Sequence, residues 1–342
     1  MRSGSAEARY SDQRVHSRPD HAVLIGGLLA DRWGGESGLL GEMCRHTLAI
    51  PGKLFRSVLL VESAVAVGGD MNLVLPAALG TEIGHVASLV HDDIIDEDEV
   101  RRGQPALHAK FGAGDALVAG DALLFDLFRC LAECRASGVP DSRIVTALEV
   151  VSQAGIDLCR GQSLESELTV TSSLDLELYT TMVRLKTGAL FSGACRVGGV
   201  LSGGSADEVS ALGCYGDELG IAFQMCDDLL AYTSAGDDVI GKSMLSDIRN
   251  RRMTLPVILA LKHTGPEDLE PLFEHARSPE AEPSAVLADI RQVMTRSGAI
   301  ERSREIAVAH ASAATDALAV LRPTASRGRL AQYASRAINR LR

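Results

Sequence analysis

Three observations on the sequence predict an all-α protein. Apolar residues make up 46% of the 342-residue chain and aromatic residues only 4%, a balance led by Ala, Leu and Val that suits helices better than sheets. Apolar residues also return every three or four positions, as in LGTEIGHVASLVHDDIID and LGIAFQMCDDLL. No strand pattern recurs along the chain.

Stretches rich in Gly, Ser and Asp separate the periodic segments and predict turns between helices. The expected helices cover about residues 20–60, 72–97, 115–135, 141–168, 175–201, 206–232 and 254–263, and two or three more follow from residue 284. A polar connection at 265–283 precedes the last helices, but nothing resembles a flexible interdomain linker. We therefore expect one all-α domain over residues 21–342, after a disordered tail at residues 1–20.

Composition argues against several classes of protein. Lys and Arg total 34 and Asp and Glu total 45, for a net charge of −11, which argues against nucleic-acid binding. Seven scattered cysteines without a CxxC pair predict reduced thiols in a cytoplasmic protein. The first twenty residues lack the apolar core of a signal peptide, and the most apolar run, at 73–90, contains Pro, Glu, Gly and His. We therefore expect no stable membrane insertion.

The stretch HDDIIDEDEVRRG, residues 91–103, places six acidic residues in eight positions. On a helix, His85, Ser88, Asp92 and Asp96 fall on one narrow face. Asp92 and Asp96 are then one turn apart, with Cβ atoms about 6 Å from each other. They could therefore share a magnesium ion whose remaining coordination positions are taken by water and a substrate phosphate. The alternative is that the acids simply form a solvated helix end. Two facts argue against it: the acids continue the apolar face of the helix, and negative charge at a helix carboxyl terminus is unfavourable for the helix dipole.

A second acidic pair closes another apolar helix, in FQMCDDLL. Gln224, Asp227 and Asp228 share a face of it by the same spacing, so two facing helices would surround several magnesium ions with carboxylates. Scattered cations in glycine-flanked settings accompany them: Lys53, Arg56, Arg101, Arg102, Lys186 and Lys242. Magnesium ions held by carboxylates, together with converging Lys and Arg, predict a substrate that carries pyrophosphate.

From about residue 24 onward these residues resemble the trans-isoprenyl diphosphate synthases, or polyprenyl synthetase family. HDDIID followed by EDEVRRGQP is similar to the first aspartate-rich motif of that family, FQMCDDLL to the second, and GKSMLSDIRNRRMTLP to the segment after it. The resemblance implies a large helical bundle of the isoprenoid synthase type around a central cavity, and a homodimer. It also implies the head-to-tail condensation of an allylic diphosphate with isopentenyl diphosphate, with three magnesium ions per active site.

The resemblance also implies a role for each matching position. The metal ligands would be Asp92, Asp96 and Asp227, with Asp93 in support and Asp228 in the outer shell. The allylic diphosphate would be held by Arg101, Lys186 and Lys242, with Gln224 nearby and Thr187 beside the reacting carbons. The diphosphate of isopentenyl diphosphate would be held by Lys53, Arg56, His85 and Arg102. Gln162 and Glu165 would face this site in the GQxxE pattern of the family.

Three departures from the family pattern concern metal and diphosphate binding. Ala231 replaces the usual third aspartate of the second motif, which predicts weaker affinity for the third ion. In PGKLFRS, the residues Pro51, Leu54 and Ser57 replace the usual Gly, Arg and Pro. Arg252 stands where the family generally has lysine, so the charge is kept.

Small residues upstream of the first motif predict a long product. Ala87 and Ser88, then Gly84 and Thr81, lie one and two turns before Asp92, where bulky residues in the resembling family stop chain growth. We therefore expect a C20 product, as from a geranylgeranyl diphosphate synthase, or a longer one. The alternative is that the small residues only allow close helix packing.

Two other functions compete with this prediction. A class I terpene cyclase shares the fold and the DDxxD helix, but it needs no second basic pocket, and its Asn/Ser/Glu triad is not visible near Asp227. A non-catalytic subunit of a heteromeric synthase would fit Ala231 and the altered PGKLFRS, and it predicts no turnover by this chain alone.

Overall fold

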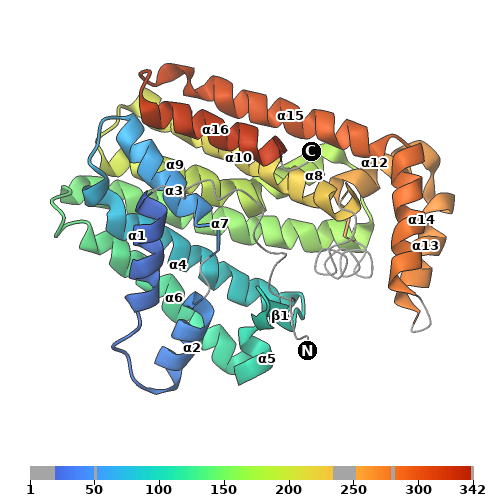
Figure 1. The fold of residues 1–342 in the computed structure, drawn as a ribbon, viewed down its shortest axis with the longest axis horizontal. Coiled ribbons are helices and arrows are strands. Elements are labelled where there is room, and N and C mark those ends of the chain that lie inside the picture. Colours follow the sequence, from blue (N-terminus) through green and yellow to red (C-terminus); the bar gives the residue numbers. More distant parts are fainter. Residues whose placement is uncertain (1–19, 50–51, 234–251, 279–281, 340–342) are drawn as a thin grey trace, which may run out of the picture.

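The computed structural model describes residues 20–49, 52–233, 252–278 and 282–339, and in these residues it is helical almost throughout (Figure 1). The amino-terminal helices are α1 (Asp20–Asp31), α2 (Gly38–Leu48), α3 (Phe55–Ala66) and α4 (Met71–Ile95). A short antiparallel hairpin, β1 (Val100–Arg101) and β2 (Gln104–Pro105), leads to α5 (Leu107–Phe111), α6 (Ala113–Glu133) and α7 (Asp141–Thr171). The predicted tail at residues 1–20, apart from its last residue, together with Pro51 and Lys242, lies outside the described residues.

The second half of the chain continues the bundle. Its central elements are α8 (Leu176–Val183), the π-helical turn η1 (Arg184–Gly188), α9 (Ala189–Leu201) and α10 (Ala206–Thr233). Its last elements are α12 (Leu255–Thr264), the 3-10 turn η2 (Pro266–Asp268), α13 (Glu270–Arg277), α14 (Pro283–Arg296), α15 (Ala299–Ala317), the 3-10 turn η3 (Leu318–Val320) and α16 (Ala325–Asn339). The all-α prediction is confirmed.

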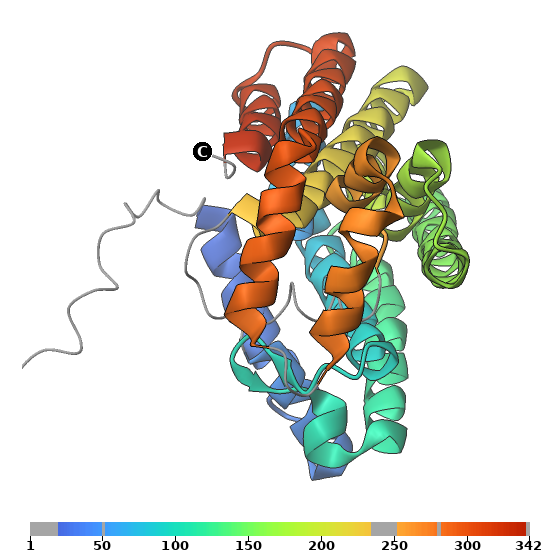
Figure 2. The same cartoon turned by 90° about the vertical axis from the view of Figure 1, so that its right-hand side faces the viewer.

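Long helices packed along one another build the bundle. Helix α4 packs against α6, and α10 packs against both α9 and α15. Helices α13 and α14 lie at one end of the bundle in Figure 1, and Figure 2, which faces that end, shows them side by side in front of the other helices. Helix α4 begins where the Asp70 side chain accepts a hydrogen bond from the backbone N–H of Asn72, at 2.9 Å, which satisfies one of the donors that a helix start leaves open.

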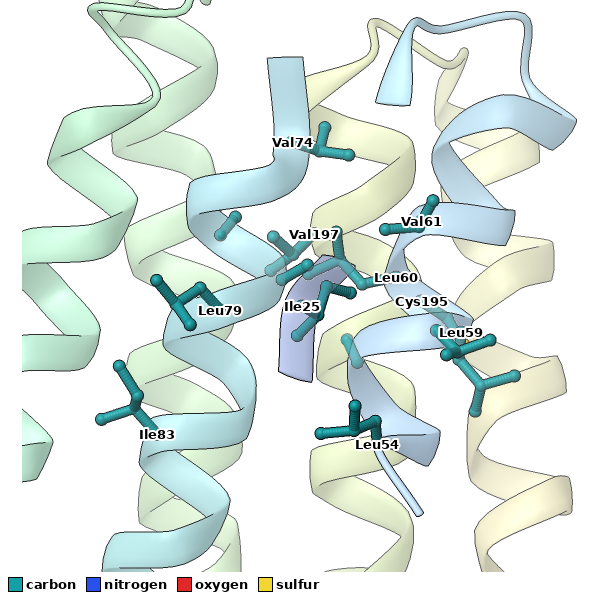
Figure 3. Close-up of a cluster of buried hydrophobic side chains, with 14 of the residues drawn as sticks. Ile25, Leu54, Leu59, Leu60, Val61, Val74, Leu79, Ile83, Cys195 and Val197 are labelled. Atoms are coloured by element: carbon teal, nitrogen blue, oxygen red, sulfur yellow. The ribbon is translucent and has the colours of Figure 1, made fainter. Parts of the chain in front are cut away.

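Two groups of buried apolar side chains form the interior. The larger joins α3, α4, α6 and α9, and Figure 3 shows Leu60 of α3 and Val197 of α9 close together in it. The smaller joins α8, α10 and α12 to α15. Leu219 belongs to the first group and Ile221 to the second, so α10 passes through both.

The predicted helix over residues 20–60 is wrong, because three separate helices cover this range. The chain turns within DRWGGESG, where Gly38 has a φ of 84°, and again at Leu54, just before α3, which has a φ of 55°. These left-handed conformations cannot continue a right-handed helix. The predicted connection at 265–283 also contains a helix, α13, and the hairpin at Val100–Pro105 was not expected.

Helix α4 is long and apolar enough to cross a membrane by length and composition, and no other helix in the described residues passes that test. More than half of its most apolar window, 56%, is buried among other helices, as expected for the central helix of a bundle. None of the seven cysteines, all of which lie in described segments, forms a disulfide, in agreement with the prediction of reduced thiols.

Candidate active site

A polar cavity of about 250 Å³ lies where the ends of α4, α7 and α10 meet the start of α12. Its charged lining residues are Asp92, Asp96, Asp98, Glu165 and Asp228, together with Arg101, Lys186 and Arg252. Segments as distant in sequence as α4 and the start of α12 thus bring acids of both aspartate motifs and cations of the predicted allylic diphosphate site to one place. We call this space the polar cavity.

Asp92 and Asp96 lie at the carboxyl-terminal end of α4, as the helical spacing predicts. Burial raises the pKa of Asp92, with Lys186 acting in the opposite direction. A carboxylate whose charge is disfavoured by burial gains most from a nearby cation. Asp96 already has one, since Arg252 lies 2.5 Å from it.

Asp93 points to the other side of α4. Its carboxylate is buried, lines a separate small pocket and accepts a hydrogen bond of 2.6 Å from Nε of Arg101. Arg101 itself lines the polar cavity. Asp93 therefore anchors a cation of the site, and in this arrangement its carboxylate is not among those that line the polar cavity.

The π-helical turn η1 interrupts the predicted helix over 175–201 and presents Lys186 to the cavity. Nζ of Lys186 lies 2.5 Å from a carboxylate oxygen of Glu165 on α7. The close approach of α7 and η1 requires Gly161, because a Cβ there would collide with the backbone of Lys186. An inserted residue in a helix often marks a functional position, but periodicity alone did not predict this one.

A chain of hydrogen bonds fixes the second acidic pair. Thr187 donates to Gln224 at 3.1 Å, and Gln224 donates to Asp228 at 2.9 Å. The other oxygen of Asp228 accepts from the hydroxyl of Tyr179, at 2.6 Å, and from the backbone N–H of Leu255, at 3.3 Å. With these three donors engaged, Asp228 suits the predicted outer-shell role better than direct metal ligation.

Asp227 precedes Asp228 on α10 but does not line the polar cavity. It lies close enough to Arg56 to raise the pKa of that guanidinium. Its predicted role as a direct metal ligand is not tested by this arrangement. Tyr179 was missed by the sequence reasoning, and only its position opposite Asp228 identifies it.

An apolar cavity of about 1010 Å³ continues from the polar one along α4, α6, α7 and α9. Asp92 lines both cavities. Thr81, Gly84 and Ser88 are among the α4 residues that line the apolar cavity, as predicted for a space beside the first motif. Because its lining is mainly apolar, this cavity suits a hydrocarbon tail and the polar cavity suits its charged head.

Ala87 does not line the apolar cavity, and in this respect its prediction was wrong. It is fully buried in the larger apolar core. Ala87 lies about 100° around the helix from Ser88, enough to turn its side chain away from the cavity and into the bundle.

The predicted second basic pocket also comes together. Arg56 at the start of α3 packs its guanidinium over the ring of Phe191, 4.6 Å from the centroid. Burial lowers the pKa of Arg56 to about 10 and lowers that of His85 well below its usual value. The guanidinium of Arg102 lies against Gly52, next to the exposed Lys53. We call Lys53, Arg56, His85 and Arg102 the basic cluster.

The described carboxylates do not form a ready-made cage: no group of three or more His, Cys, Asp or Glu side chains in these segments is close enough to enclose a metal ion. Magnesium does not need one, since it keeps several waters and takes one or two carboxylates together with substrate phosphates. The polar cavity, with Asp92 and Asp96 on one wall, therefore fits an ion that arrives with its diphosphate.

The sequence model of the family described as "Polyprenyl synthetase" matches residues 37–294. The chain belongs to the polyprenyl synthetase family. A short chain isoprenyl diphosphate synthase of Methanothermobacter thermautotrophicus is 35% identical over 296 residues, 86% of this chain and 88% of the relative. A geranylgeranyl diphosphate synthase of Methanosarcina mazei is 33% identical over 301 residues, 88% of this chain and 90% of the relative.

Solved structures agree with this assignment. The crystal structure of geranylgeranyl pyrophosphate synthetase from Pyrococcus horikoshii superposes with a TM-score of 0.84 at 31% identity, over 93% of this chain and 95% of that one. This polyprenyl synthetase therefore has the all-α isoprenoid synthase fold, and it is a trans-prenyltransferase that makes prenyl diphosphates. The named relatives are prenyl diphosphate synthases, which argues against the terpene cyclase.

Proposed function

We propose that this trans-prenyltransferase depends on magnesium and lengthens an allylic diphosphate with isopentenyl diphosphate to a C20 or longer product. The observation that carries the proposal is the position of Asp92, at the junction of the polar and the apolar cavity. A diphosphate in the first would leave its prenyl tail in the second.

The acidic residues would bind the metal ions and the basic residues would bind the diphosphate. Asp92, Asp96 and Asp227 would hold up to three magnesium ions, and Arg101 and Lys186 would bind the allylic diphosphate through charge-assisted hydrogen bonds. Bound ions would neutralise the departing diphosphate and so favour ionisation of the allylic C–O bond. Lys242 would add a further contact from a segment outside the described residues.

The basic cluster would position the second substrate. Nε of Arg56 and Nδ1 of His85 are buried and make no hydrogen bond within the described segments, as expected of groups that a ligand completes. Holding the double bond of isopentenyl diphosphate at attack distance from the allylic carbon supplies much of the rate. The apolar walls exclude water from the carbocation, and the lost proton is expected to leave with the departing diphosphate.

Product length follows from the α4 wall. From Thr81 to Asp92 the cavity borders α4 over three turns, about 17 Å of helix. Three of its α4 residues, Thr81, Gly84 and Ser88, are small, so these three place no floor near the reacting carbons. The volume of about 1010 Å³ is at the upper end of the range for small-molecule sites.

The activity assay is direct. Purified protein is incubated with magnesium, isopentenyl diphosphate and a C5, C10 or C15 allylic diphosphate, and the products are sized by chromatography. We expect products of C20 or longer, and no turnover after chelation of the metal. A product that stops at C15, or turnover without a divalent ion, would contradict the proposal.

We also propose that the enzyme is a cytoplasmic homodimer. Helix α6 exposes Leu117, Val118, Phe125 and Phe128, and Phe125 is 73% exposed. A second copy of the chain on this face would remove these side chains from water. Light scattering is expected to give twice the mass of the chain, and Phe125→Glu to shift the enzyme towards the monomer. A monomeric wild type would contradict the homodimer.

A further inference from the structure

Glu82 is a buried carboxylate that none of the roles above uses. It lies on α4, three residues before His85, with only 2% of its surface exposed. The hydroxyl of Ser57 donates a hydrogen bond to the carbonyl oxygen of Ala78 at 2.7 Å, and Oε2 of Glu82 shares that donor at 3.3 Å. The carboxylate is thus attached to the first turn of α3, next to Arg56.

Glu82 is also the main negative influence on the basic cluster. Burial lowers the pKa of both Arg56 and Arg102, and for each of them Glu82 is the strongest opposing influence. The reciprocal effect is present as well: burial raises the pKa of Glu82, and Arg56 and then Arg102 oppose that rise. A lone buried carboxylate is costly unless charges of the opposite sign lie near it.

We propose that Glu82 is a positioning residue for the second substrate, the one whose diphosphate the basic cluster binds. This inference rests on the proposed function. Three cations brought together from the start of α3 and from the hairpin repel one another before a ligand arrives. Glu82, held by Ser57, supplies the counter-charge that keeps Arg56 and Arg102 in place, and the cluster stays positive enough to attract a diphosphate.

The first experiment separates KM from kcat. Glu82→Gln keeps the size of the side chain and removes its charge. We expect the KM for isopentenyl diphosphate to rise about tenfold or more, the effect of removing one member of a buried charge group. The allylic KM and kcat should stay within about threefold. Glu82→Asp, which keeps the charge, should recover part of the loss.

A matched control is available in Glu62, another buried glutamate with an arginine partner. Its carboxylate is 1% exposed and lies 2.7 Å from Arg329, away from both cavities. Glu62→Gln should leave both KM values unchanged, although it lowers stability. If Glu82→Gln does not fold, Ser57→Ala removes the hydroxyl that holds Glu82, and it should raise the same KM by a smaller factor.

Calorimetry with isopentenyl diphosphate alone, without metal or allylic substrate, separates this inference from the proposed function. Binding by the wild type and at least tenfold weaker binding by Glu82→Gln would support it. If the wild type does not bind isopentenyl diphosphate, the proposed second pocket is wrong. If the wild type binds it and Glu82→Gln or Ser57→Ala binds equally well, the role of Glu82 is refuted.

Discussion

Arg252 and Asp96 form an ion pair of 2.5 Å across the polar cavity. Asp96 ends the first aspartate motif at the carboxyl-terminal end of α4, and Arg252 precedes α12, so the two halves of the chain meet at this contact. The side chains are only 26% and 18% exposed, which limits screening by solvent. The guanidinium of Arg252 is therefore paired with the carboxylate of Asp96, which we expect to bind magnesium.

Removal of this competitor should strengthen metal binding by the ligand-free enzyme. We expect Arg252→Gln to bind Mn²⁺ roughly threefold to tenfold more tightly, because Asp96 loses its protein counter-ion. Electron paramagnetic resonance on the protein without substrate measures this affinity. Arg135→Gln, which removes an exposed ion pair with Asp141, is the control and should have no effect. Weaker Mn²⁺ binding by Arg252→Gln would show that the pair does not compete with the ion.

Neighbouring substitutions on α4 should have different effects. Ser88→Phe narrows the apolar cavity and should shift the product distribution to shorter chains. Ala87→Phe overpacks the core and should cost about 1–3 kcal/mol of unfolding free energy without a comparable shift. Product sizing and urea denaturation measure the two effects. Shortening by Ala87→Phe alone would mean that the growing tail follows another face of α4.

Thiol reactivity should report on the apolar cavity. Cys159 and Cys214 are exposed, whereas the other five cysteines are buried. Burial raises the pKa of Cys130 and of Cys195 to about 12, so these two form almost no reactive thiolate at pH 8. We expect two fast-reacting thiols in the native enzyme, identified by mass spectrometry.

Cys159 also lines the apolar cavity, and Cys214 does not. A bound non-hydrolysable C15 allylic diphosphate should therefore protect Cys159 from maleimide and leave Cys214 reactive. Equal protection of the two, or of neither, would place the tail elsewhere.

Ala231 should weaken the third metal site. Its side chain lies outside the described residues, so this prediction comes from its position in FQMCDDLLA. Ala231→Asp restores a carboxylate one turn after Asp227 and should lower the magnesium concentration needed for half-maximal activity. A magnesium titration under saturating substrates measures this requirement, with Ala231→Asn as the uncharged control. An unchanged requirement would contradict the prediction.

The sequence was sufficient for features that one helix sets by itself. The separation of Asp92 from Asp96 follows from 3.6 residues per turn, and so does the face shared by Gln224 and Asp228. The motifs also indicated the family. Breaks between helices were harder to predict, because a non-glycine residue in a left-handed conformation, such as Leu54, has no clear signal in the local sequence.

Only the tertiary structure decided which groups meet across helices. The contacts of Arg252 with Asp96, and of Tyr179 with Asp228, join segments that are distant in the sequence. Ser88 faces the apolar cavity and Ala87 faces the packed core. Which of the two does so depends on where α4 touches its neighbours. Helix periodicity determines angles around one axis, whereas the depth, crossing angle and rotation of packed helices depend on all of their side chains together.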